Sequence, residues 1–379
     1  MLSKIAWQSC LFLPLLWHIS AALPQSATQS AAASSSTLAC NNSPSLCNRS
    51  YSNITHLGAH DSPFIANSSN SFTVSGNQFY SSTTQLSAGV RLLTAQLHNA
   101  NSSTGQTEIH LCHTSCGLYD AGRLEDWLSD IKGWMDNNPN DVVTILLVNS
   151  DNFDASTLGS VFESSGISKY AYSPDFTSPP TSWPTLQSLI SVNARLITFI
   201  ASLPSSDNSA APYLLNEFTY IFENPFDVTS ASNFSCTPSR PSSLGGSISA
   251  ADSSNMMFLM NHFLDIKGYF GIETPSTNVS DSTNSPDITL TGSLGQSASQ
   301  CASAYGKNPN FLLVDWFNVG PAISTADNLN GVTNPVGRLS VSSDILSKGH
   351  QGAATTLSTM SGSKVALLVG LAVVFSGWL

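Results

Sequence analysis

Apolar runs of strand length recur along the chain from residue 54 to residue 317. Several of these runs are nearly continuous in apolar residues, which is typical of parallel strands that are buried on both faces. We predict eight strands from them, at residues 54–60, 90–97, 109–113, 142–149, 196–200, 218–222, 256–262 and 311–317.

The clearest helical pattern lies between the third and fourth of these runs. Apolar side chains share one face there at helical spacing, namely Leu124, Trp127, Leu128, Ile131, Trp134 and Met135. We expect Asp120 to cap the start of this helix and the segment Asn137-Asn138-Pro139 to end it. A weaker helix is predicted over 185–192. The alternation of strands and helices predicts one irregular TIM-type (β/α)8 barrel, in which chemistry belongs at the C-terminal ends of the strands.

The composition of the chain narrows its class. It has 379 residues, of which only 10% are charged, and a formal net charge of −11. An acidic chain does not suit a nucleic-acid partner, because binding phosphates needs a basic surface. Low charge with abundant Ser, Thr and Asn instead suits a secreted protein whose solubility comes partly from attached sugar.

Both ends of the chain carry predicted targeting signals. Residues 1–22 are predicted to be a signal peptide, with Lys4 before an apolar stretch and small residues at the cleavage positions. At the other end, an apolar tail over 365–379 follows a polar spacer and small residues, the order of a glycosylphosphatidylinositol (GPI) anchor signal. Gly352 is the predicted attachment residue. A membrane-spanning helix is the alternative at each end, but the 15-residue tail would make only ~22 Å of helix against a ~30 Å bilayer core.

These signals divide the chain into five parts. They are a signal peptide (1–22), a Ser/Ala-rich leader with a Cys40–Cys47 loop (23–49), the barrel (50–338), a Ser/Thr-rich stalk (339–352) and the GPI-signal propeptide (353–379). We therefore expect a single folded domain at the cell surface, the plasma membrane or the cell wall. The sequence does not predict an oligomeric state.

Six cysteines remain after removal of the signal peptide, and an even number in a secreted chain predicts three disulfides. Short spacings favour Cys40–Cys47 and Cys112–Cys116, which would leave Cys236–Cys301, although six cysteines allow 15 pairings. Zinc held by Cys112, His113 and Cys116 is the alternative for the middle pair. Seven N-x-S/T sequons predict glycosylation at Asn41, Asn48, Asn53, Asn67, Asn101, Asn233 and Asn278.

Histidines gather at the ends of the predicted strands. His60-Asp61 follows the first run, His110 and His113 end the third, and Asp315 lies in the last. Two histidines are what cleavage of a phosphodiester needs, one to take a proton from the attacking hydroxyl and one to protonate the leaving oxygen. Other polar residues in or at the ends of strands are predicted substrate contacts: Gln96, Asn149, Asn261 and His262.

The ordered motifs resemble the phosphatidylinositol-specific phospholipase C superfamily, in its secreted fungal branch. They are G-A-H-D-S at 58–62, A-G-V-R-L-L at 88–93, I-H-L-C-H-T at 109–114, N-P-N-D-V-V-T-I-L-L-V-N at 138–149, W-P-T-L at 183–186, N-E-F-T-Y at 216–220, N-H-F-L-D at 261–265 and N-F-L-L-V-D-W at 310–316. The resemblance covers roughly residues 50–330 and implies an irregular TIM-type barrel.

The resemblance also implies roles for the site residues. His60 matches the general base, His113 the general acid and Asp61 the acid after the first histidine, while Asp315 is a plausible partner for His60. In such enzymes an inositol hydroxyl attacks the phosphorus, a cyclic phosphodiester forms and diacylglycerol leaves. The implied substrate is an inositol phospholipid or a GPI.

The second strand departs from the family pattern. Metal-free members carry Asp and Arg where this chain has Thr94 and Gln96, and calcium-dependent members carry acidic ligands there. We therefore predict no cofactor and no calcium site, and a missing positive charge. Arg91 and Lys132 are not obvious substitutes, and charge neutralisation matters because removing one stabilising donor typically costs about 2.7–4 kcal/mol.

Three hypotheses follow from these residues. The first is a secreted, GPI-anchored phosphodiesterase that uses His60 and His113. The second is a catalytically weak or inactive barrel that binds glycan or lipid at the cell surface, which the missing charge motivates. The third is a metal phosphodiesterase with His56, His60, His110 and His113 as ligands, which the lack of acidic ligands beside them disfavours.

Overall fold

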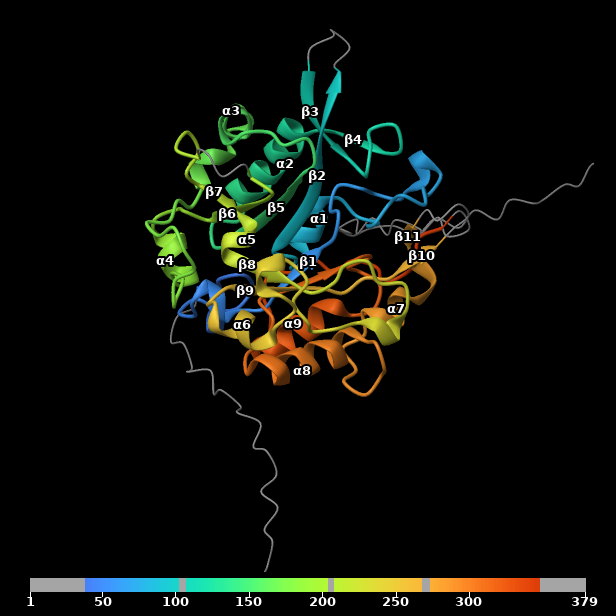
Figure 1. Cartoon of the computed structure of the whole chain (residues 1–379). Helices are drawn as coiled ribbons and strands as arrows, with labels where there is room; N and C mark the ends of the chain where they lie inside the picture. The colour runs from blue at the N-terminus through green and yellow to red at the C-terminus, as the bar shows by residue number, and fades with distance from the viewer. Residues whose placement is uncertain (1–37, 102–106, 204–207, 268–272, 348–379) are drawn as a thin grey trace, which may run out of the picture. The chain divides into compact units, whose positions relative to one another are not determined.

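A computed structural model describes residues 38–101, 107–203, 208–267 and 273–347 (Figure 1). All of them belong to one compact unit. The predicted signal peptide, the GPI signal and Gly352 lie outside these residues. In the part of the chain that is described, no helix is both long enough and apolar enough to cross a membrane.

Eight parallel strands form the barrel, in the spatial order β7-β6-β5-β2-β1-β12-β9-β8. The two ends of this sheet, β7 and β8, follow each other in sequence and are separated by the single helical turn α5 (Glu217–Tyr220). The barrel is therefore irregular, and it is open between β7 and β8. The predicted fold class is confirmed. The strands are β1 (His56–Ala59), β2 (Leu92–Asn101), β5 (Val143–Asn149), β6 (Leu196–Ala201), β7 (Leu214–Asn216), β8 (Ile221–Glu223), β9 (Met257–Asn261) and β12 (Phe311–Val314).

The strand prediction needs two corrections. The run at 109–113 belongs to β3 (Thr107–Cys112), which pairs antiparallel with β2 and with β4 (Asp120–Arg123) and is not a barrel strand. Figure 1 shows β2 and β3 extending together as a hairpin beyond the other strands. The barrel strand β7 was not predicted, because three residues are too short to show a periodic pattern.

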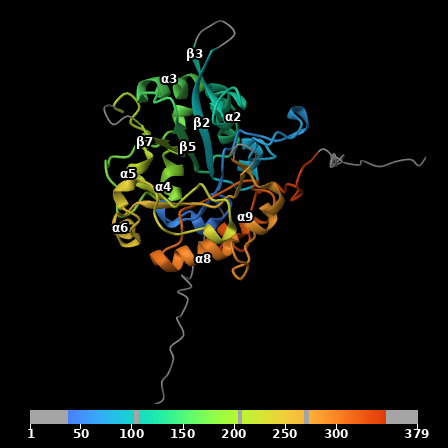
Figure 2. The ribbon, with the colours of Figure 1, turned by 45° about the vertical axis from the view of Figure 1, so that its right-hand side comes forward.

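Helices cover the outside of the barrel. They are α1 (Ser82–Ser87), α2 (Leu124–Asn137), α3 (Ala155–Ser165), α4 (Leu186–Ser191), α6 (Ile248–Ser253), α7 (Ser280–Thr283), α8 (Leu294–Tyr305) and α9 (Ala322–Asn330). Helix α2 packs with α3, and α8 packs with α9; the two pairs lie on different sides of the strands (Figures 1 and 2). Helix α2 ends at Asn137, within the segment expected to end it, but Arg123 and not Asp120 precedes it, because Asp120 belongs to β4.

Alternate residues of each strand face two different layers. Leu93, Leu147 and Met260 pack with the helices, whereas neighbours such as Leu146 and Leu259 pack in a second cluster inside the barrel. That inner cluster also contains Tyr51, Trp183, Cys40 and Cys47, which close the end of the barrel where the strands begin. The opposite end, where the strands finish, is the mouth of the barrel. Side chains just beyond the inward-facing strand positions point toward this mouth.

The boundaries of the folded unit differ from the predicted ones. The Cys40–Cys47 loop is buried in the inner cluster and so belongs to the barrel, not to a leader. Ile345 and Leu346 pack against a cluster that contains Trp316, so the segment just after 339 is attached to the domain and is not a free stalk.

All three predicted disulfides are present: Cys40–Cys47, Cys112–Cys116 and Cys236–Cys301. The zinc alternative fails, because oxidised Cys112 and Cys116 offer no thiolate to a metal.

Candidate active site

The register of two adjacent strands brings His60 to Asp315. Ala59 pairs with Val314, and each strand continues directly into one of these residues. The backbone N–H of His60 donates to Val314 O at 2.8 Å, and His60 Nδ1 lies 2.9 Å from Asp315 Oδ1. The Phe263 ring stacks on the imidazole with centroids 3.9 Å apart. His60 is therefore fixed by its strand, by a carboxylate and by an aromatic ring.

Asp61 lies between the two predicted catalytic histidines. Its backbone is left-handed (φ 47°), and its N–H donates to Thr94 Oγ1 at 2.8 Å. Its carboxylate Oδ2 is 3.7 Å from His60 Nε2 and 3.4 Å from His113 Nε2. The two Nε2 atoms are thus no more than about 7 Å apart. The side chains of His60 and His113 are 22% and 14% exposed, so a substrate can reach both.

His113 lies on the turn after β3, where the Cys112–Cys116 disulfide closes a short loop. Its N–H donates to Tyr119 O at 2.9 Å, and its ring meets Phe64 edge-on with centroids 5.2 Å apart. The hairpin that the sequence did not predict therefore carries the second histidine over the mouth of the barrel.

Gln96 connects these parts. Its Nε2 donates to Asp61 Oδ2 at 2.8 Å, and its Oε1 accepts from the backbone N–H of Thr114 at 2.9 Å. Thr114 follows His113 and has a left-handed φ of 62°. Both ends of the Gln96 amide thus bond within the protein and hold Asp61 and the turn of His113 together, while its predicted contact with substrate stays a prediction.

The two imidazoles differ in pKa. Burial lowers the pKa of His60, but the charges of Asp61 and Asp315 outweigh burial and raise it to about 9. For His113, burial lowers the pKa by more than the charge of Asp61 raises it. At neutral pH the pair therefore holds one proton, mostly on His60.

The cations named in the sequence lie elsewhere. Arg91 directly precedes β2, at the far end of the barrel, and binds Asp141 at 2.6 Å, and Lys132 pairs with Asp136 on α2. Within the described ranges, no lysine or arginine makes a hydrogen bond or ion pair with His60, Asp61, His113 or Asp315. The positive charge of this site is the protonated His60 itself.

Three predicted substrate contacts are committed to structural bonds. Asn149 hydrogen-bonds the backbone of Phe153 with both ends of its amide, and Asn261 Nδ2 donates to Glu223 Oε2 at 2.9 Å. His262 is fully buried against Phe234, with Nε2 3.0 Å from Thr283 O. These side chains thus make structural bonds, and their contact with substrate stays a prediction.

The metal hypothesis fails on geometry. His56 and His60 stand at opposite ends of one strand, and four residues span about 13 Å of strand. His110 Nδ1 instead binds Asp120 at 2.9 Å on the hairpin. The four histidines therefore cannot surround one ion.

Most of the sequons are accessible. Asn48, Asn53, Asn233 and Asn278 are exposed and Asn67 is half-buried, while the side chain of Asn101 is not among those described. Asn41 differs, because it is only 5% exposed and its Oδ1 accepts from Val142 N. A glycan needs its asparagine at the surface, so Asn41 is the least accessible of the set.

Two site residues were missed by the sequence reasoning. Phe263 follows His262 in the motif N-H-F-L-D, so the segment was recognised but its stacking residue was not. Asn77 donates to Asp315 Oδ1 at 3.0 Å from an irregular segment that carries no sequence signal.

Known proteins resemble this chain. The family model PI-PLC X (described as "PI-PLC X 1") matches residues 46–330. The PI-PLC X domain-containing protein 1 of Arthroderma benhamiae is 36% identical over 296 residues, covering 78% of this chain and 90% of that protein. Another protein of the same fungus, named "Uncharacterized secreted protein", is 35% identical over 302 residues, covering 78% of this chain and 64% of that protein.

Solved structures resemble it more distantly. The phosphatidylinositol-specific phospholipase C from Listeria monocytogenes superposes with a TM-score of 0.46 at 15% identity, over 76% of this chain and 95% of that one. A Staphylococcus aureus phosphatidylinositol-specific phospholipase C with pentafluoro-Phe incorporated gives 0.49 at 13% identity, over 75% and 94% of the two chains.

Proposed function

The chain belongs to the PI-PLC X family, and we propose that it is a phosphodiesterase of the phospholipase C type that cleaves an inositol phospholipid or a GPI. One observation carries this proposal. His60 and His113 face one carboxylate, Asp61, from two sides, with their Nε2 atoms at most about 7 Å apart. This separation supports the proposal, because an acid and a base at this distance can both reach one phosphodiester.

Asp315 suits His60 to the role of general base. It holds Nδ1, which leaves Nε2 to take the proton of the attacking inositol hydroxyl, and it stabilises the imidazolium that forms. His113 would protonate the leaving oxygen of diacylglycerol. The proton taken by His60 and the proton given by His113 balance, and a cyclic phosphodiester remains.

In the resting protein the proton shared by the two histidines lies mostly on His60. This is not the protonation state that these roles need, because a general base must be neutral. The productive form carries the proton on His113 instead. Asp61 Oδ2 is near both Nε2 atoms and would stabilise either charged ring. The productive form is then a minor one, and we expect slow turnover for this reason and because no arginine assists.

The experiment compares the wild type with His60→Ala and His113→Ala on phosphatidylinositol vesicles, with melting temperature as the control for folding. Both variants should lose turnover. On a phosphodiester with an aryl leaving group, which needs no protonation, His113→Ala should recover most of its rate and His60→Ala should not. Wild-type turnover that both variants retain would contradict the proposal.

The second candidate is a barrel that binds glycan or lipid without turnover. The observation that favours it is the lack of a lysine or arginine bound to the four site residues within the described ranges. A panel of phosphodiesters separates the two, since hydrolysis of any of them that depends on His60 removes this candidate.

The proposed location is the cell surface, after secretion, with glycans and a GPI anchor. The sequence signals support it, and one relative is named a secreted protein. Treatment of intact cells with a GPI-cleaving enzyme should release the protein, and Gly352→Leu should leave it unanchored. Retention on the membrane after that treatment would contradict the anchor.

A further inference from the structure

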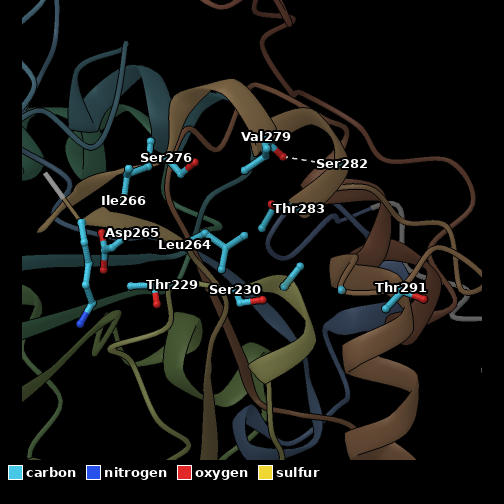
Figure 3. Close-up of a pocket in the computed structure, with 13 residues that line it drawn as sticks. Thr229, Ser230, Leu264, Asp265, Ile266, Ser276, Val279, Ser282, Thr283 and Thr291 are labelled. Carbon is cyan, nitrogen blue, oxygen red and sulfur yellow. Dashed lines mark hydrogen bonds between the residues drawn. The ribbon is translucent and has the colours of Figure 1, made fainter.

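A pocket of about 580 Å³ lies beside β10 (Asp265–Lys267), which pairs with β11 (Glu273–Pro275). Figure 3 shows Leu264, Thr283 and Ser230 around it, with Asp265 and Thr229 at one side. Its polar lining consists largely of hydroxyl groups, from Thr229, Ser230, Ser276, Ser282, Thr283 and Thr291. Neither the catalytic pair nor its carboxylates line this pocket, so the mechanism does not use it.

One short segment joins this pocket to the catalytic pair. Phe263 stacks on His60, and the next two residues, Leu264 and Asp265, line the pocket. The backbone of this segment is held at both sides, because Asp265 N donates to Val228 O and Leu264 O accepts from Ser276 N. Burial and the charge of Asp315 raise the pKa of Asp265 to about 7. The residues that line the pocket thus begin directly after the ring that stacks on His60.

His113 lies on the other side of Asp61. Its neighbours are Phe64, Tyr119 and the turn held by Gln96, and none of these residues lines the pocket. In the proposed reaction His60 faces the hydroxyl-bearing head group and His113 faces the lipid that leaves. A group in the pocket would therefore extend from the head group and not from the lipid.

The lining indicates the chemistry of that group. The one lysine, Lys267, is paired with Glu273 at 2.9 Å, so it offers no free charge to an anion. Hydroxyl groups both donate and accept hydrogen bonds, and Leu264, Ile266 and Val279 add aliphatic surface. This mixture suits a neutral sugar, which has hydroxyls at its rim and C–H groups on its faces, and the volume lies within the range of ligand pockets.

We propose that this pocket is a subsite for a neutral sugar attached to the inositol head group, so that the preferred substrate is a glycosylated inositol phospholipid. The inference rests on the proposed function, which supplies the side on which the head group lies.

The experiment uses the full mature chain and two lipids in identical vesicles, phosphatidylinositol and the same lipid with one neutral hexose on the inositol ring. The wild type should show about tenfold higher kcat/KM for the hexosylated lipid, which corresponds to about 1.4 kcal/mol. Ser230→Trp should fill the pocket and remove this preference while leaving phosphatidylinositol cleavage unchanged.

Ser232→Trp is the matched control. Ser230 and Ser232 are both exposed and their hydroxyls contact each other at 3.0 Å, so each substitution breaks the same bond. Only Ser230 lines the pocket, and Ser232→Trp should keep the preference. Equal kcat/KM for the two lipids in the wild type would overturn the subsite. So would an equal loss on both lipids in Ser230→Trp.

If the wild type cleaves neither lipid, the proposed function fails, and binding then decides the subsite separately. Titration calorimetry would compare glycerophosphoinositol with its hexosylated form. Tighter binding of the hexosylated form, lost in Ser230→Trp and kept in Ser232→Trp, would support the subsite. Equal affinities would overturn it.

Discussion

A histidine lies at each end of strand β1, and the two ends of the barrel shift the pKa of this side chain in opposite directions. His56 begins β1 and is buried between Tyr51 and Phe311, with no carboxylate among its contacts in the described residues. Burial lowers its pKa to about 4. His60 follows β1 and faces Asp61 and Asp315, which raise its pKa to about 9 despite burial. Burial alone makes a histidine a neutral core residue, whereas burial with carboxylates makes it a proton carrier.

The largest expected effect separates the two ends by activity. His60→Ala should lower kcat by about 10²- to 10⁴-fold, the usual worth of a general acid or base. His56→Ala should leave kcat per folded molecule unchanged, because His56 lies at the closed end. Steady-state kinetics with folded protein counted by near-UV circular dichroism measures both. Equal losses in the two variants would break the comparison.

The second prediction tests the closed end through stability against pH. In the unfolded chain His56 takes a proton near pH 6.5, but in the folded chain it does so only near pH 4. Protonation therefore favours the unfolded chain, and the free energy of unfolding is not reduced by this residue above pH 6.5. Stability should therefore fall between about pH 6.5 and 4, by up to about 3 kcal/mol for this residue. His56→Phe should remove that share of the loss in urea titrations at pH 7.5 and 4.5.

His60 should act in the opposite sense. Its folded pKa is raised, so its stabilising contribution is complete below about pH 6.5 and is lost as the pH rises through about 9. Burial also lowers the pKa of His262 to about 4. The His56→Phe variant should therefore still lose the part of its stability at low pH that is due to His262. An unchanged pH dependence in His56→Phe would contradict the assignment of His56 as a buried neutral ring.

The third prediction removes a carboxylate from the open end of the barrel, so that His60 has a surrounding closer to that of His56. Asp315→Asn removes a charge from His60 Nδ1, so the pKa of His60 should fall toward its ordinary value. The alkaline limb of the kcat/KM profile, expected near pH 9, should move toward neutral pH. We expect kcat to fall by about tenfold or more, because the charge that stabilises the imidazolium formed in the reaction is lost, and this outweighs the larger share of neutral His60. Asp287→Asn, an exposed aspartate outside the site, should change neither. An alkaline limb that stays in place would show that Asp315 does not set it.

The smallest expected effect concerns Gln96. Gln96→Met keeps the length of the side chain but removes the bonds to Asp61 and to the Thr114 N–H. We expect kcat to fall by about tenfold with KM nearly unchanged, since the acid loses its alignment and no substrate contact is lost. Gln96→Glu keeps the bond to Thr114 and should retain the position of the turn while repelling Asp61. A rise in KM without a change in kcat would return Gln96 to the role of substrate contact.

Much of the barrel was accessible from periodicity. Long apolar runs such as 142–149 and 311–317 became β5 and β12, because strands buried on both faces must be apolar throughout. The strand β7 was missed because it is short. The hairpin strand β3 was taken for a barrel strand, because an apolar run does not show whether its strand pairs parallel or antiparallel. Asp120 was expected as a helix cap and instead binds His110 across the hairpin, a choice made by strand pairing.

The candidate site divides in the same way. The motif around His60 and Asp61, the histidine at 113 and the aspartate at 315 were visible as residue types at strand ends. Asn149, Asn261 and His262 had the same position in the pattern, yet their side chains turned to structural bonds. A residue at the end of a strand can satisfy its hydrogen bonds within the protein or leave them for a ligand, and its neighbours in space decide which.

The sequence by itself indicated a barrel of buried strands, the two disulfides of short spacing and the histidines at strand ends, because these follow from local periodicity, short spacing and residue type. Only the tertiary structure decided that His56 is a core ring and His60 a charged one. It also decided that Gln96 aligns Asp61 and the turn of His113, and that the residues of a hydroxyl-lined pocket begin directly after the ring that stacks on His60. These depend on contacts between segments up to 255 residues apart in sequence, and the energy of a contact depends on distance in space, which no local pattern records.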